Sequence, residues 1–208
     1  VRGGRSTALR PVLMPANLVT AELRSRVNDQ LAGLTVELAE SRAPFYSEPL
    51  AAAAFEWVTL LTATVAPEDQ PFPRLYAALA ALLDLVCAAP SARWWLRAMV
   101  RYEALLLAEL GFGLDLERCA VTGERADLAY VSPRTGRAVT AEGAAGHEHK
   151  LLPLPHFLTQ GGEAGWDDIL AGLALTGRFV EQSLLTERRA DVMAARERLV
   201  ERLKRAVA

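Results

Sequence analysis

One cysteine opens a turn that could form half of a zinc site. In the stretch C-A-V-T-G, Cys119 and Gly123 occupy the positions of a C-x-x-C-G turn, but Thr122 stands where the second thiolate is required. A structural zinc site needs four ligands, usually supplied as two such pairs. The following segment GRAVTAEG, residues 136–143, contains neither Cys nor His. We therefore expect a turn without metal and a protein without a cofactor.

Two histidines offer a different route to metal or acid–base chemistry. His147 and His149 flank Glu148, and on a strand both rings would face the same way. Together with Cys119 they would supply three ligands, and Glu148 or Asp127 would have to supply the fourth. The surrounding glycines are typical of an exposed loop, and the chain has no G-x-S-x-G, phosphate-loop or H-E-x-x-H motif. We expect no enzymatic activity; metal-dependent hydrolysis at the two histidines is the alternative.

A row of arginines in residues 92–113 suggests a binding surface. Arg93, Arg97 and Arg101 recur every four residues, so they share one face of a helix, and the row then becomes apolar. Such a surface suits a peptide that combines acids with a terminal aromatic ring. Arginine stems that cover an apolar core would give the same pattern. The candidate peptide-binding residues are Arg97, Arg101, Leu105, Leu110 and Phe112.

Basic residues also gather at both ends of the chain. Residues 1–26 contain five arginines and one acid, and residues 186–205 contain seven basic residues and four acids. These clusters fit contacts with phosphates, although solvated faces are the simpler interpretation. The candidate DNA-binding residues are Arg2, Arg5, Arg10, Arg24, Arg26, Arg198, Arg202 and Arg205.

The composition places these residues in a globular protein. With 208 residues, 51% hydrophobic and 23% charged, the chain can bury the core of one or two domains. Its apolar stretches are short or rich in alanine, and no secretory signal opens it. Cys87 and Cys119 offer no disulfide framework, which fits a reducing compartment. We expect a cytoplasmic protein.

The elements that must position these residues are strands first and helices afterwards. Alternating side chains in 18–23 and 34–38 indicate two half-buried strands joined by the turn R-V-N-D-Q. Because the chain opens without Met, we expect further strands upstream. A hairpin with the turn S-P-R-T-G interrupts the helices. The expected helices cover 48–66, 71–88, 92–110, 155–160, 166–185 and 191–208, so the fold class is α+β and mostly α.

Several of these segments resemble one family. The segments VRGGRS, LRPVLMPANLV, RYEALLLAELGFGLDLERCAVTG, LAYVSPRTGRAV and LLPLPHFL are similar to those of the RecO recombination-mediator proteins, over nearly the whole chain. The resemblance implies a partial N-terminal OB-fold in 1–47, a helical domain in 48–112 and 150–208, and a zinc-ribbon-like insertion in 113–149 that lacks the zinc ligands. Packing of Leu128, Tyr130 and Val139 would then hold the insertion together.

The resemblance also implies a function in DNA repair. RecO-like proteins bind single- and double-stranded DNA, anneal complementary strands, engage RecR, and contact the acidic tail of single-stranded-DNA-binding protein so that RecA can be loaded. The implied location is the cytoplasm, at the nucleoid. Residues 1–44 contain no aromatic residue on which bases could stack. The alternative is a protein-interaction adaptor that does not bind DNA itself.

Overall fold

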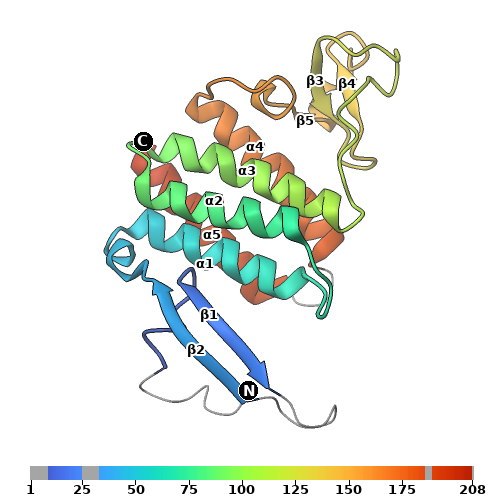
Figure 1. The fold of residues 1–208 in the computed structure, drawn as a ribbon. Helices are drawn as coiled ribbons and strands as arrows, with labels where there is room; N and C mark the ends of the chain where they lie inside the picture. Colours follow the sequence, from blue (N-terminus) through green and yellow to red (C-terminus); the bar gives the residue numbers. More distant parts are fainter. Residues whose placement is uncertain (1–8, 25–32, 186–188, 208) are drawn as a thin grey trace.

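Five α-helices form the body of the part of the chain that the computed structural model describes, residues 9–24, 33–185 and 189–207. They are α1 (Pro49–Val65), α2 (Pro73–Ala88), α3 (Ala92–Glu109), α4 (Trp166–Phe179) and α5 (Arg189–Val207). A two-stranded ribbon and a three-stranded sheet lie at opposite ends of this body (Figure 1). The expected fold class, α+β with mostly helix, is confirmed at this level.

Local sequence signals explain where several helices begin and end. Proline occupies the first turn of α1 and of α2, where its missing N–H costs no helical hydrogen bond. The Ser91 hydroxyl caps α3 by accepting a hydrogen bond from the backbone N–H of Arg93, and Gly111 follows the helix with a φ of 87°. The expected segment 155–160 forms only the single 3₁₀ turn His156–Leu158. After Phe179, α4 continues as a π-helical turn, Val180–Leu184.

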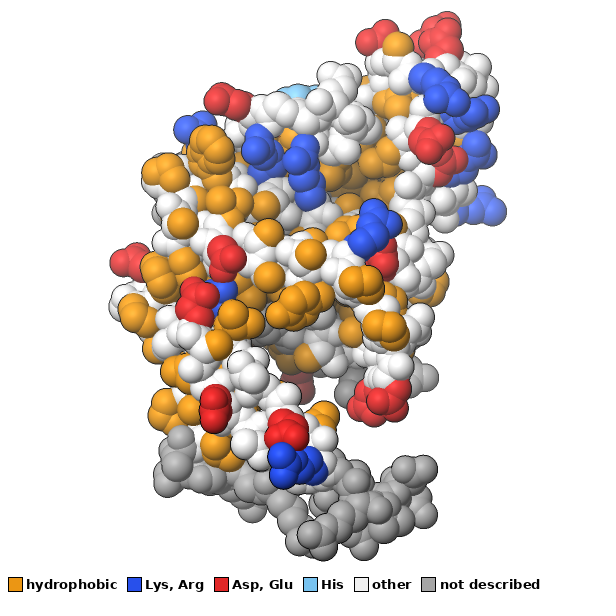
Figure 2. All heavy atoms as spheres, viewed as in Figure 1, with side chains coloured by type: hydrophobic (Ala, Val, Ile, Leu, Met, Phe, Trp, Pro, Cys, Tyr) orange, Lys and Arg blue, Asp and Glu red, His pale blue; other side chains and the backbone are white. Residues whose placement is uncertain are grey.

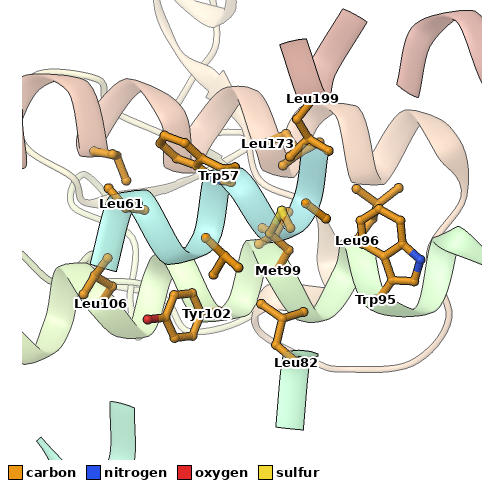
Figure 3. Close-up of a cluster of buried hydrophobic side chains, with 14 of the residues drawn as sticks. Trp57, Leu61, Leu82, Trp95, Leu96, Met99, Tyr102, Leu106, Leu173 and Leu199 are labelled. Atoms are coloured by element: carbon orange, nitrogen blue, oxygen red, sulfur yellow. The ribbon is translucent and has the colours of Figure 1, made fainter. Parts of the chain in front are cut away.

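The core lies between α1, α3, α4 and α5, and α2 covers the outer side of α1 and α3 (Figures 1 and 3). Trp57 and Leu61 of α1 are fully buried, as are Leu96 and Leu106 of α3. A side chain at Gly172 of α4 would begin 3.0 Å from both Phe157 and Val100. Glycine at this position therefore lets α4 approach α3 closely. In the described residues, no helix is both long and apolar enough to cross a membrane.

The N-terminal ribbon consists of β1 (Leu18–Arg24) and β2 (Gly33–Glu40), which pair antiparallel with Leu23 opposite Leu34. Both strands were expected, whereas the turn R-V-N-D-Q lies outside the described residues. The described part forms no closed barrel, so the expected OB-fold remains a prediction. The Tyr46 hydroxyl donates to the carbonyl of Pro15 at 2.8 Å and helps attach the ribbon to α1.

The insertion between α3 and α4 contains the predicted hairpin, β3 (Leu128–Val131) and β4 (Ala138–Thr140). A short strand that the sequence did not suggest, β5 (Leu152–Pro153), pairs with the other edge of β3. The small core of the insertion consists of Cys119, Val139 and Ala144, with Leu128 and Tyr130 packed against it. The predicted core side chains are therefore confirmed as packing partners.

Candidate peptide and nucleic-acid interface

The turn around Cys119 keeps the geometry of a metal-binding knuckle. Its Sγ is 1% exposed and accepts hydrogen bonds from the backbone N–H groups of Val121 at 3.4 Å, Thr122 at 3.3 Å and Thr140 at 3.3 Å. Burial alone would raise the pKa of this thiol. The hydrogen bonds from Thr122 and Thr140 outweigh burial and lower the pKa to about 6. Protein donors thus stabilise the thiolate in the way that a cation would.

The two histidines are not arranged as a metal site requires. The segment Glu148–Lys150 forms a 3₁₀ turn, so His147 and His149 do not lie on a strand and do not share a strand face. Across the residues that the structure describes, no group of three or more His, Cys, Asp or Glu side chains could hold a metal ion. Nothing in this geometry supports the alternative of metal-dependent hydrolysis.

The C-terminal arginines are partly engaged with the protein itself. Arg198 pairs with Glu56 at 2.5 Å, and Arg202 donates to the carbonyl of Pro49 at 2.5 Å, so both fasten α5 to the beginning of the helical body. Arg205 pairs with Glu201 on its own helix at 3.6 Å. These cations are therefore partly neutralised, which reduces what each can contribute to phosphate binding.

Only two of the N-terminal candidates can be placed. Arg10 is exposed, whereas Arg24 makes two hydrogen bonds to the carboxylate of Glu22, at 2.8 and 3.0 Å. Arg2, Arg5 and Arg26 lie outside the described residues.

A groove of about 250 Å³ runs between α2 and α3, and it contains two of the predicted peptide-binding residues. Arg101 and Leu105 line one side, and apolar side chains of α2 line the other. Arg101 and Arg97 donate to the carbonyls of Phe157, at 2.8 Å, and Gly162, respectively. The groove is lined by Ala78, Ala81, Leu82, Leu85, Ala98, Arg101, Tyr102 and Leu105.

Two other predicted residues lie away from this groove. Leu110 is half-buried against the main core. Phe112 is 48% exposed and lines a separate hollow with Phe179 and Arg134. The arginine row on α3 therefore leads into the groove at Leu105, whereas the residues beyond the end of the helix turn away from it.

Comparison with known proteins identifies the family. The family described as "Recombination protein O C terminal" matches residues 47–190. This chain belongs to the RecO family. A DNA repair protein RecO from Rhodospirillum centenum is 42% identical over 99% of this chain and 82% of its own length. The corresponding protein of Paracoccus denitrificans is 44% identical over 98% of this chain and 82% of its own length. The chain therefore has a role in DNA repair and recombination.

The sequence did not reveal the half of the groove that α2 supplies in this RecO chain. Ala78, Leu82 and Leu85 recur at helical spacing, which marks an apolar face. Periodicity does not say which neighbouring helix that face contacts, or that a groove stays open beside it. An exposed aromatic residue at the beginning of α3, Trp94, was also missed, although it stands within the arginine row.

Proposed function

We propose that this chain is a recombination mediator that binds single- and double-stranded DNA and anneals complementary strands. It helps to load RecA on DNA coated with single-stranded-DNA-binding protein, and it engages RecR. It acts by binding rather than by catalysis, in the cytoplasm at the nucleoid. The main structural support is the groove between α2 and α3, which has an arginine at its rim and an apolar floor.

The groove suits the tail of single-stranded-DNA-binding protein, which in bacteria ends in acids followed by Pro-Phe and a free carboxylate. An aromatic ring can be buried against Leu82 and Leu105, while the guanidinium of Arg101 faces a carboxylate. Arg97 lies one turn away on the same face of α3 and can pair with a second acid. The side chain of Arg101 keeps donor capacity because a guanidinium has five N–H groups.

A charge-matched pair of variants tests this groove. Ala81 is exposed on α2 and lines the groove, so Ala81→Glu places a carboxylate beside the tail, whereas Ala81→Lys adds a cation of similar length. We expect Ala81→Glu to weaken binding of a tail peptide and Ala81→Lys to preserve or strengthen it, measured by isothermal titration. Equal effects of both variants would show that the tail does not bind in this groove.

A second measurement separates mediator from adaptor. We expect the chain to bind an unstructured oligonucleotide without sequence preference, and each phosphate contact to add roughly 0.7 to 0.9 to the slope of log affinity against log salt. Charge reversal at Arg5, Arg24 and Arg26 together should lower both affinity and slope. If the chain binds the tail peptide but no oligonucleotide at low salt, it is an adaptor and the proposed DNA binding is wrong.

A further inference from the structure

The first turns of α3 expose a tryptophan among arginines. Trp94 is 52% exposed, while the neighbouring Trp95 is buried in the core at 5%. The guanidinium carbon of Arg97 lies 5.9 Å from the centre of the Trp94 ring. That of Arg93 lies 5.8 Å from the ring of Trp166 at the beginning of α4. This surface, Arg93, Trp94, Arg97 and Trp166, is called the tryptophan–arginine face below.

The position of Trp94 is not explained by the packing of the helices. Trp95 fills the core position on α3, and leaving half of a second indole in water forgoes hydrophobic stabilisation. The arginines cover only part of the aromatic surface, and a cation over a ring is attracted by its π electrons. In Figure 2, basic side chains follow α3 beside hydrophobic ones. The face thus combines a flat apolar surface with positive charge.

We propose that Trp94 is a stacking platform for an unpaired base of single-stranded DNA, with Arg93 and Arg97 contacting the neighbouring phosphates. This proposal rests on the DNA binding proposed above and assigns a site for it on the helical domain. Binding of single strands commonly combines cationic side chains with aromatic rings on which bases stack. Since residues 1–44 contain no aromatic side chain, such a ring must come from elsewhere in the chain.

The shape of the face favours a base over an acidic peptide. The hollow beside Trp94 is shallow, about 70 Å³, and is lined by Arg93, Arg97, Glu163 and Ala164. It cannot enclose a peptide side chain as the larger groove at Leu105 can, but an open ring accepts a base on its face. Glu163 is the carboxylate in this hollow, and it repels phosphates. Its removal should therefore strengthen binding.

The first test compares bases with phosphates. The full chain is titrated with oligo(dT) and with an abasic oligonucleotide of equal length, and binding is followed by fluorescence anisotropy. We expect Trp94→Ala to weaken oligo(dT) at least about fivefold and to leave abasic binding unchanged, because only bases stack. Trp94→Phe should retain most of the affinity. Phe112→Ala, which removes another exposed aromatic ring at the far end of α3, is the matched control and should change neither.

The second test concerns charge. Arg93→Gln and Arg97→Gln should each lower the salt slope for oligo(dT) by roughly 0.7, whereas Arg178→Gln on α4 should not. Glu163→Gln should tighten binding. Because Arg97 also contacts the carbonyl of Gly162, circular dichroism must show that its variant remains folded.

The outcomes distinguish this site from DNA binding in general. If Trp94→Ala binds oligo(dT) as well as the unmodified chain does, the platform is wrong while DNA binding stands. Equal losses for oligo(dT) and abasic DNA would also overturn it, because the ring would then act through local structure. Loss of tail-peptide binding alone would make the face a peptide site. Failure of the unmodified chain to bind any oligonucleotide would overturn both proposals.

Discussion

The indole N–H of Trp57 donates a hydrogen bond to Oε1 of Glu103 at 2.7 Å, and the carboxylate is completely buried. Its other oxygen accepts from the hydroxyl of Thr176 and lies 3.4 Å from Nη2 of Arg196. The Arg196 guanidinium in turn lies 5.6 Å from the centre of the Trp57 ring. One buried carboxylate therefore joins α1, α3, α4 and α5, the helices that carry the proposed binding surfaces.

Removing this carboxylate should destabilise the helical body severely. Glu103→Ala leaves Arg196 buried without its ionic partner, and breaking a buried ion pair in this way costs about 3–5 kcal/mol. Glu103→Gln should cost less, because its amide oxygen can still accept from Trp57. Urea denaturation measures both changes in the free energy of unfolding. If the two variants are equally stable, the ion pair with Arg196 contributes nothing beyond the hydrogen bond.

Gly177 of α4 gives a second test of the same network. A Cβ at this position would lie 2.4 Å from the guanidinium carbon of Arg196, so Gly177→Ala must displace the buried arginine. We expect a loss of about 1–3 kcal/mol, the usual cost of overpacking. In an Arg196→Ala background the overlap disappears, and the same change should stabilise the helix by roughly 0.5–1 kcal/mol. A double-mutant cycle by thermal denaturation would reveal whether the sign changes as expected.

Most helix positions follow from local sequence signals, but the centre of the fold does not. The Ser91 cap and Gly111 bound α3 correctly to within one residue, because both signals act on the adjacent backbone. Glu103 carries no such signal. Its charge suggests an exposed position, and its partner Arg196 is 93 residues away. Burial of this kind depends on tertiary packing, which a single sequence does not display.

The candidate site shows the same division. The spacing of Arg97, Arg101 and Leu105 placed them on one helical face, and the structure puts Arg101 and Leu105 in one groove. Phe112 was assigned to that surface by extending the helical row past Gly111, where the chain no longer follows the helix. The row could predict neighbours only as far as the helix continues.

The pKa of Cys119 predicts how the insertion responds to pH. Because hydrogen bonds lower the folded-state pKa to about 6, below about 8.5 for an unfolded thiol, the thiolate stabilises the fold. This contribution is fully present above about pH 8.5 and is lost as the pH falls through about 6. The stability difference between the protein and Cys119→Ala should therefore grow over this interval, as measured by thermal denaturation. A pH-independent difference would mean that the buried sulfur remains a neutral thiol.

Ultraviolet thiolate absorbance checks the same prediction directly. The titration is carried out in a Cys87→Ser background so that only Cys119 contributes. Burial raises the pKa of Cys87, so the two thiols should in any case titrate separately. A midpoint near that of a free thiol would contradict the assignment.

The last prediction concerns the metal. We expect the unmodified chain to carry no stoichiometric zinc and to be unaffected by chelators, because Cys119 is the only thiol in the insertion and a structural site needs four ligands. Elemental analysis of the purified protein measures this. About one zinc per chain would overturn the prediction.

The arrangement around Cys119 also predicts how a metal site could be introduced. Its Sγ lies 3.5 Å from Oγ1 of Thr140, and a Cβ at Gly143 would lie 3.2 Å from both atoms. Sulfur atoms at the corners of a zinc tetrahedron are ~3.8 Å apart, given Zn–S bonds of about 2.3 Å. Thr122 holds the remaining corner, two residues after Val121 would be too far along the turn but directly at the C-x-x-C spacing from Cys119. The four positions therefore converge.

The variant Thr122→Cys, Thr140→Cys, Gly143→Cys should consequently bind one zinc ion and melt at a higher temperature with zinc than without it. Metal binding supplies folding free energy when the ligands meet only in the folded chain, so a chelator should remove the gain. The matched control replaces the same three residues with serine, which preserves size but provides no thiolate. If the cysteine variant melts like the serine variant in the presence of zinc, the four positions do not form a tetrahedral site in the folded insertion.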